Sequence, residues 1–411
     1  MFKSITAIAT LLLAAAILYA GNGLQSTLLS VRGGIEGFPT TVIGLLASAY
    51  YAGFILGCRF VPGMIKGVGH IRAFVALASI ASSSALAHIL FVEPVSWAGL
   101  RFVTGFSFAG LTMVLESWIN ERATNENRGK VLSVYRMVDL GAVTVGNGLL
   151  AIAPPSGFHL FVLVSILISI ALVPVALTRT DSPAPLETAK LDIVQLYRVS
   201  PVGAVGAAAT GLANAAFWGM APVYVQEIGY GAAMIAAFMS AAIIGAGLFQ
   251  FPMGSLSDRV DRRIVIVGSS LLGAGAATLL ASFAGLSENA LLGFSFLFGA
   301  FIIPVFGICA AHANDHSEPG KSVATSGGLL LLYGVGSVIG ALVGALVMSA
   351  FQPAALFWYV AGVYLVLAVF SLLRIGINRP RIVGKKSRYI PMAKSPLTRV
   401  YRKRAKTQPK S

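Results

Sequence analysis

Long apolar stretches recur along this chain, and they constrain its fold more than any other feature. A helix needs about 20 mostly apolar residues to cross the hydrocarbon core of a bilayer. Twelve segments have this character, and they cover residues 5–29, 40–62, 72–92, 96–119, 131–153, 158–178, 201–222, 231–253, 264–285, 290–312, 322–350 and 354–375. Only 11% of the residues are charged, too few to cover a soluble surface. The sequence therefore predicts an all-α membrane protein with twelve transmembrane helices, because helices satisfy their backbone polar groups internally.

The distribution of basic residues predicts the orientation of these helices. If the N-terminus is cytoplasmic, both termini, the even-to-odd connections and the adjoining helix ends hold 27 of the 30 Lys and Arg residues. The opposite side keeps Arg32 and four acidic residues, which are Glu36, Glu93, Glu227 and Glu288. An excess of Lys and Arg on one side is typical of the cytoplasmic side. We therefore expect a multi-pass protein of the cell (inner) membrane with cytoplasmic N- and C-termini.

The two halves of the sequence repeat each other. A shift of 191 residues, chosen to place Gly63 on Gly254 and Arg72 on Arg263, also places Lys130 on Lys321. Parallel repeats of this kind are typical of secondary transporters, whose site lies near the midplane between the halves. The predicted organisation is an N-terminal six-helix bundle at 1–178, a linker at 179–200, a C-terminal six-helix bundle at 201–376 and a tail at 377–411. The bundles are expected to be pseudo-symmetric.

The tail carries most of the net charge of +15. From Arg374 onward there are 13 basic residues and no acidic residue, whereas the rest of the chain holds 17 basic and 15 acidic residues. Such a segment cannot bury a core, and we expect it to be disordered and to contact anionic lipids. Because the body of the chain is nearly neutral, we do not expect nucleic-acid binding.

The sequence gives no indication of enzymatic chemistry. The two cysteines, Cys58 and Cys309, lie in apolar segments, and their spacing predicts neither a disulfide nor a metal site. His312 and His316 are four residues apart with Asp315 between them, but we expect them at a helix end in a loop, and a metal site would need a third convergent ligand. No nucleotide-hydrolysing motif occurs, and we expect no cofactor. The expected partners are a small-molecule substrate, protons and the bilayer, with the chain acting as a monomer powered by an ion gradient or by the gradient of its substrate.

A decad between the eighth and ninth segments, GSLSDRVDRR at 254–263, is the densest short charge cluster. It resembles the signature loop of the major facilitator superfamily at Gly254, Leu256, Asp258, Arg259, Arg262 and Arg263. Asp261 departs from that pattern, which usually has Gly, and the first-half copy at 63–72 has Gly67 in place of the Asp. The string RFVTG at 101–105 resembles the fourth-helix Arg-x-x-x-Gly pattern of the same family. Further strings are similar to its YcaD-like bacterial branch, namely ESWINERA (116–123), NAAFWGMAPVY (214–224), QFPMGSLSDR (250–259) and AHANDH (311–316).

The resemblance implies a gate at the cytoplasmic side. Asp258 is expected to contact the start of the fifth helix, at 128–130, when that side is closed. An acid at a helix N-terminus contributes about 0.3–2 kcal/mol, which suits a contact that must also open. In the alternative interpretation the cluster only holds the loop inside, which accounts for the arginines but not for Asp258. The gate candidates are Gly254, Asp258, Arg259, Arg262, Arg263, Arg128 and Lys130.

Ionisable residues inside membrane spans indicate function by default, because their burial is unfavourable. Arg136 and Asp139 share one face of the fifth helix, and Glu116 lies near the cytoplasmic end of the fourth. Two interpretations are open. Arg136 and Asp139 can be a structural ion pair, or Asp139 can carry a proton while Arg136 binds an anionic group or competes with the proton. Glu116 completes this set of proton-coupling candidates.

Polar and aromatic residues at equivalent places in the two halves suggest a central substrate site. The candidates are Asn22, Gln25, Arg101, Asn214, Phe217 and Trp218. Amides and aromatics suit a small polar or amphipathic organic substrate. Equally, single amides in spans are often interhelical hydrogen bonds, and Arg101 can extend toward the outer surface. The sequence as a whole predicts proton-coupled efflux of a small organic solute by alternating access; a uniporter and a non-transporting receptor or scaffold are the alternatives.

Overall fold

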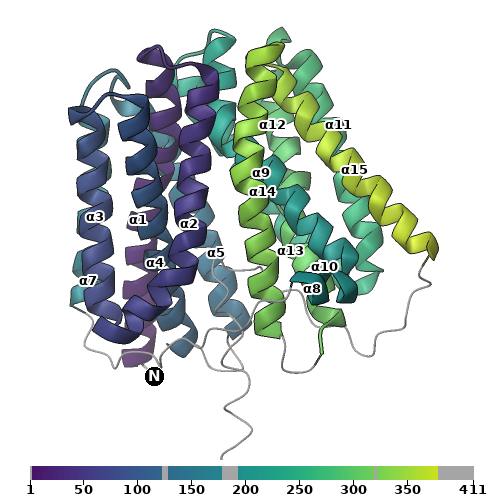
Figure 1. Cartoon of the computed structure of the whole chain (residues 1–411), viewed down its shortest axis with the longest axis horizontal. Helices are drawn as coiled ribbons and strands as arrows, with labels where there is room; N and C mark the ends of the chain where they lie inside the picture. The colour runs from purple at the N-terminus through teal and green to yellow at the C-terminus, as the bar shows by residue number, and fades with distance from the viewer. Residues whose placement is uncertain (1, 123–127, 178–192, 319–321, 378–411) are drawn as a thin grey trace, which may run out of the picture.

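The computed structural model describes residues 2–122, 128–177, 193–318 and 322–377. Two bundles of long helices stand side by side, as Figure 1 shows. The first bundle contains α1 (Phe2–Ile35), α2 (Thr40–Val68), α3 (His70–Leu90), α4 (Pro94–Arg122), α5 (Arg128–Leu149) and a span formed by α6 (His159–Ile170) and α7 (Leu172–Ala176). The second contains α9 (Pro201–Glu227), α10 (Ala232–Arg259), α11 (Arg262–Phe283), a span formed by α12 (Glu288–Ile302) and α13 (Val305–His316), α14 (Ser322–Ala350) and α15 (Ala355–Ile377). The predicted all-α fold of twelve helices in two bundles is confirmed.

Ten of these spans are both long enough and apolar enough to cross a membrane by composition alone. The remaining two are α5 and α9, of 22 and 27 residues. Charged residues such as Arg136 and Asp139 make α5 less apolar, and α9 is rich in Ala and Gly. Both pack inside the bundles, α5 against α1 and α9 against α14. The helix with the weakest apolar character is thus the one that carries the predicted proton site.

The predicted linker is partly folded. Its last residues form a short helix, α8 (Ile193–Val199), whose Leu196 is buried against residues of α9, α13 and α14. The end of the linker is therefore packed onto the second bundle. Residues 178–192 and the predicted tail at 378–411 lie outside the described residues.

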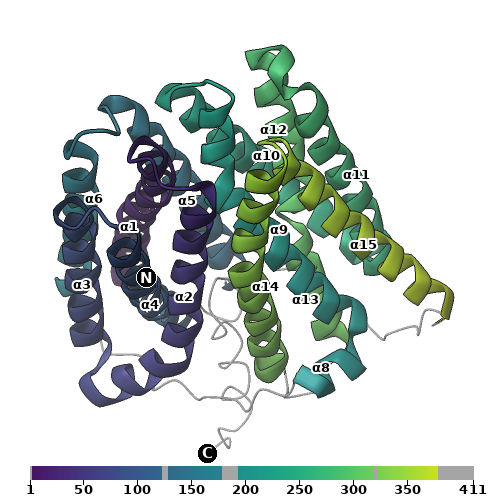
Figure 2. The same cartoon turned by 45° about the horizontal axis from the view of Figure 1, so that its top comes forward.

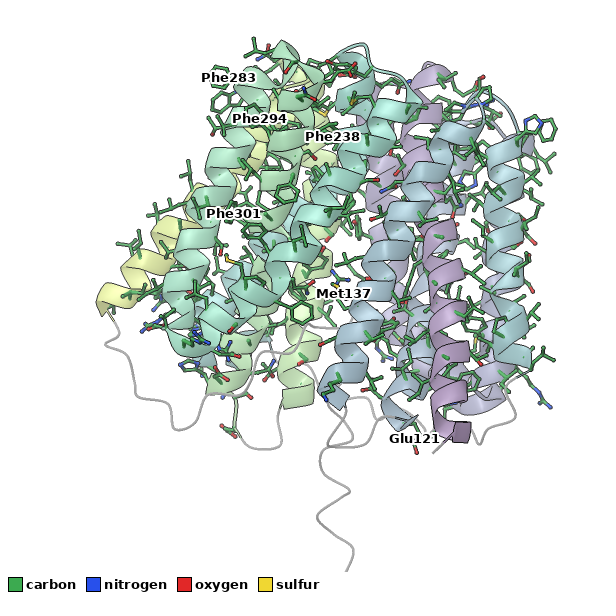
Figure 3. The ribbon with its side chains drawn as sticks, turned by 180° about the vertical axis from the view of Figure 1, so that it is seen from behind. Glu121, Met137, Phe238, Phe283, Phe294 and Phe301 are labelled. Atoms are coloured by element: carbon green, nitrogen blue, oxygen red, sulfur yellow. The ribbon has the colours of Figure 1, made fainter. Side chains whose placement is uncertain are left out.

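The two ends of the molecule differ in charge. We call the end that carries Arg59, Lys66, Arg72, Arg259 and Arg263 the basic face; the N-terminus lies at this end (Figure 1). The acidic face is the opposite end, which carries Glu36, Glu93, Glu227 and Glu288. Glu121, at the end of α4, marks the basic face in Figure 3, and Phe283 lies near the acidic face.

Close helix crossings occur at equivalent places in the two bundles. A Cβ atom added to Gly105 of α4 would lie 1.9 Å from the carbonyl oxygen of Tyr50 in α2. In the second bundle, a Cβ atom on Gly299 of α12 would lie 1.9 Å from the carbonyl oxygen of Ala242 in α10. Only glycine allows the backbones to approach this closely. The repeat seen in the sequence is thus also a repeat of helix packing.

The two bundles are joined toward the acidic face. Four hydrogen bonds join them on that side: Ser30 to the Gly219 carbonyl at 2.9 Å, Thr40 to Glu227 at 3.1 Å, Ser48 to the Val338 carbonyl at 2.7 Å and Gln226 to the Val31 carbonyl at 3.3 Å. Toward the basic face α2 turns away from α14, as Figures 1 and 2 show. Pro62 lies inside this part of α2, and a proline inside a helix causes a bend.

Candidate functional site

Three ionisable side chains are buried in α4 and α5. Arg101, Glu116 and Asp139 are each no more than 5% exposed. Arg136 and Asp139 lie one turn apart on α5, and they form an ion pair. The predicted pair is therefore present, in the helix that packs against both α1 and α10.

Glu116 reaches α5 through a tyrosine rather than through Arg136. The hydroxyl of Tyr135 donates to Oε1 of Glu116 at 3.4 Å and lies 2.5 Å from the hydroxyl of Tyr19 in α1. Asp139 lies one turn beyond Tyr135 on the same helix face and within electrostatic range of both tyrosines. Two hydroxyl groups thus link Glu116 in α4 to Tyr19 in α1 by way of Tyr135 in α5, and the charge of Asp139 acts on both tyrosines. We call Glu116, Tyr135, Tyr19 and Asp139 the hydroxyl chain.

Tyr19 and Tyr135 do not appear among the sequence-based candidates. Each is one helical turn from a residue that does, since Tyr19 precedes Asn22 by three positions and Tyr135 precedes Asp139 by four. Tyrosine is common in apolar helices, so residue type alone gave no signal. The spacing to a charged residue within the span is the signal that could have found them.

The fourth-helix motif works through a tight helix crossing. The close approach of Gly105 to the backbone of Tyr50 brings α2 against α4. One turn away, the guanidinium of Arg101 lies over the Tyr50 ring, 4.4 Å from its centroid. The Tyr50 hydroxyl donates to Oδ1 of Asn22 at 3.4 Å. Arg101 therefore points into the bundle, and the contacts bring two predicted site residues, Arg101 and Asn22, to the same tyrosine.

Other predicted site residues divide between the interface and the core. Gln25 is fully buried, and both polar atoms of its amide lack a hydrogen-bond partner among the described residues. Asn214 in α9 lies close to Tyr333 in α14, and Arg136 is within electrostatic range of that tyrosine. Phe217 instead stacks on Phe298, with ring centroids 4.6 Å apart, inside the second bundle.

The remaining aromatic candidate lies beside this core. Trp218 is partly buried and packs edge to face on Phe217, with centroids 5.3 Å apart. Phe217 therefore contributes to packing of the second bundle, while Trp218 continues the aromatic cluster at its edge.

The charged decad is mostly helix. Gly254 to Arg259 form the last turns of α10, and only Val260 and Asp261 separate that helix from α11. Asp258 pairs with Arg262 at 3.0 Å, and Arg262 is almost completely buried. Arg262 also donates to Asp315 of α13 at 2.7 Å and to the Ser257 hydroxyl at 2.9 Å. The motif is therefore an anchor that ties α10, α11 and α13 together at the basic face.

The contacts of Asp261 account for the presence of an acid where the family pattern usually has Gly. One of its carboxylate oxygens accepts from the backbone N–H of Arg263 at 2.9 Å and so caps α11, and the Arg263 guanidinium pairs with it at 2.7 Å. Burial raises the pKa of Asp261, but the hydrogen bonds and charge of Arg263 outweigh it and hold the pKa below its ordinary value of 3.8.

The expected partner of Asp258 across the bundles lies partly outside the described residues. The side chain of Arg128 is among those not described, and Lys130 is exposed at the start of α5. Arg259 is also exposed. The contact between Asp258 and α5 stays a prediction for the state in which the basic face is closed.

Comparison with known proteins places these features in a family. The sequence profile of the Major Facilitator Superfamily matches residues 11–246 and 203–407. The MFS-type transporter YcaD of Salmonella typhi is 26% identical over 341 residues, which cover 82% of this chain and 88% of that protein. YcaD of Salmonella newport (strain SL254) has the same identity and coverage.

Solved structures share the same architecture. The nucleoside transporter NupG superposes with a TM-score of 0.75 at 13% identity, over 89% of this chain and 98% of its own. A bacterial homologue of the human lysosomal transporter Spinster, in an inward-facing and occupied conformation, superposes with a TM-score of 0.72 at 15% identity, over 88% of this chain and 95% of its own. At these identities the likeness concerns the fold.

Proposed function

Because this chain belongs to the major facilitator superfamily, whose members are membrane transporters rather than enzymes, we propose that it exports a small organic solute in exchange for protons by alternating access. The single observation that carries the proposal is the Arg136–Asp139 ion pair inside α5. A membrane span that serves packing alone has no need of a buried carboxylate. In alternating access, the surroundings of such a pair change between states, and proton binding can follow that change.

The hydroxyl chain supports the same proposal. Glu116 lies closer to the end of its helix at the basic face than Asp139 does, and it is hydrogen-bonded to Tyr135, whose hydroxyl lies beside that of Tyr19. Both tyrosines are within electrostatic range of Asp139. Hydroxyl groups both donate and accept hydrogen bonds, so they can pass a proton along a chain. In this scheme Glu116 exchanges protons near the basic face, and Asp139 is the carboxylate that senses the state of the transporter.

The position of the contacts between the bundles is consistent with the orientation that the basic residues predict. The bundles are joined toward the acidic face and diverge toward the basic face. With the basic face cytoplasmic, the described state is the one that receives solute from the cell interior. We also propose that the chain works as a monomer and that its basic tail contacts anionic lipids of that leaflet.

The proposal is tested on the full chain, purified and reconstituted into vesicles that enclose a pH-sensitive dye. A panel of small organic compounds is first screened by the rise they cause in Tm. Each compound that binds is then loaded into vesicles, and movement of solute and protons in opposite directions is the expected result. Solute flux without proton movement would establish the uniporter alternative. Binding without flux would favour a receptor or scaffold, in which case removal of the tail, rather than changes at the central site, should abolish the cellular phenotype.

A further inference from the structure

Arg101 is a buried cation without an acidic partner, and we propose that its counter-ion is the transported solute, a small organic anion with a carboxylate group. This inference rests on the proposed transport function, which it makes more specific. Four other described arginines, Arg32, Arg136, Arg262 and Arg263, pair with an acidic side chain, whereas Arg59, Arg72 and Arg259 are exposed. Arg101 pairs with none in the described part of the chain, although it is only 5% exposed. Buried charges are normally paired, so the missing partner points to a bound anion.

The surroundings of Arg101 enclose its guanidinium without giving every N–H group a hydrogen-bond partner among the described residues. Tyr50 covers a face of the group, since the guanidinium carbon lies 4.4 Å from its ring centroid. Nη1 of Arg101 is buried and has no hydrogen-bond partner among the described residues. A guanidinium presents its N–H groups as a planar fork that matches the two oxygens of a carboxylate. The edge of Arg101 is therefore suited to bind a carboxylate while its face stays on Tyr50.

A second unsatisfied group occurs on the neighbouring helix. Gln25 is fully buried, and neither polar atom of its amide has a partner among the described residues. It lies one turn from Asn22, which accepts a hydrogen bond from Tyr50, the tyrosine that Arg101 covers. Buried amides without partners are rare, and each such group calls for an explanation. An organic anion with a further polar group would satisfy the amide of Gln25 as well as Arg101.

The surrounding charges favour an anion over a cation. Asp139, the buried acid of α5, is already paired with Arg136. Arg101 and Arg136 both lie within electrostatic range of tyrosines that face the interface, Arg101 of Tyr51 and Arg136 of Tyr333. The ring of Tyr51 packs on that of Tyr50, with centroids 5.6 Å apart. Aromatic rings next to a free cation suit an organic acid better than an inorganic anion.

The inference is tested with three carboxylates and their uncharged amides as probes: benzoate, 4-hydroxybenzoate and cinnamate. The full chain is purified in detergent without carboxylate buffers, and Tm is measured with each probe. We expect at least one carboxylate to raise Tm by about 1–3 °C at ten times its Kd, with no rise from its amide. The rise should disappear in Arg101→Gln and persist in Arg32→Gln, a matched change at the acidic face. Equal rises from carboxylate and amide, no rise from any carboxylate, or the same rise from sodium chloride would each overturn the inference.

The ligand-free protein provides a second, independent readout. If Arg101 is unpaired until the anion binds, Arg101→Gln removes an unpaired buried charge, and the ligand-free Tm should stay the same or rise. If Arg101 serves the fold, the ligand-free Tm should fall, and the inference is then wrong. Flux measurements separate this inference from the transport proposal. Transport of the amides but not of the carboxylates contradicts the anion alone, whereas carboxylate binding without flux contradicts transport and keeps the anion site.

Discussion

Arg262 at the start of α11 donates from Nε to Asp315 at the end of α13, over 2.7 Å, and both side chains are buried. The same guanidinium pairs with Asp258 in the last turn of α10. One arginine of the charged decad therefore fixes the ends of three helices. This gives the decad a role in packing as well as its predicted role in gating, and the two roles are separable by substitution.

Asp315→Asn is expected to lower the free energy of unfolding by about 2–3 kcal/mol. The reason is that Arg262 loses its buried acidic partner, whereas Asp258, which also pairs with it, is more exposed. Thermal unfolding of the purified protein measures the loss. Arg259→Gln is the matched control, since Arg259 is exposed at the same face and its removal should change stability by less than about 0.5 kcal/mol. An equal loss of stability in both variants would show that the buried Arg262–Asp315 pair stabilises the protein no more than an exposed charge does.

Asp261→Asn is expected to lower Tm by an amount that does not vary between pH 8 and pH 5. The pKa of Asp261 is lowered in the folded protein, so its stabilising effect is present above the ordinary pKa of 3.8. That effect is lost only as the pH falls through the lowered pKa. The difference in Tm between the wild type and the variant should therefore shrink below about pH 4. A difference that already shrinks between pH 7 and pH 5 would contradict the lowered pKa.

Asp258→Asn is expected to shift the transporter toward the state that is open at the basic face, by up to about tenfold. The first bundle has Gly67 at the equivalent position, so no second acid compensates. Spin labels at the exposed residues Lys130 and Ser255 report the distance between the bundles at that face. Labelled Lys66→Gln serves as the comparison, because it removes an exposed charge of the basic face that is not among the gate candidates. An unchanged distance distribution would show that Asp258 has no role in gating and that it serves only to pair with Arg262.

The boundaries of the helices follow closely from the sequence. The predicted span at 322–350 coincides with α14, and the spans at 40–62 and 231–253 differ from α2 and α10 mainly by six further residues at the basic face. Bilayer thickness fixes the apolar length of a span, which is why apolar composition predicts it well. It does not report where a helix continues beyond the lipid, and for this reason the decad was expected to be a loop.

The partners of buried side chains were harder to predict. Arg136 and Asp139 lie on one helix, so helical spacing alone predicted their ion pair. Tyr135 reaches Glu116 across a helix interface, and Arg262 reaches Asp315 across another. Such contacts depend on helix rotation and on crossing points like that of Gly105 with Tyr50. One sequence contains no direct measure of either quantity.

Tyr135→Phe is expected to slow proton-driven transport by at least about tenfold while leaving the fold intact. The substitution keeps the ring and removes the hydroxyl that lies between Tyr19 and Glu116. Proton movement into dye-loaded vesicles measures the effect, and counterflow of solute at equal pH should be unchanged. Tyr230→Phe is the matched control, because Tyr230 lies near the acidic face, away from the hydroxyl chain. If proton-driven transport is as fast in Tyr135→Phe as in the control, protons reach Asp139 by another route.

Asp139→Asn is expected to abolish accumulation driven by a pH gradient and to preserve counterflow of solute. Asparagine keeps the shape of the side chain and can still accept a hydrogen bond from Arg136, but it cannot carry a proton. Both activities are measured in the same vesicles, with Glu121→Gln as the control because Glu121 is exposed at the end of α4. The structural interpretation of the pair makes the opposite prediction. An ion pair that serves only packing would make Asp139→Asn less stable, since Arg136 loses its charged partner, while pH-driven accumulation per folded molecule would stay at the wild-type level.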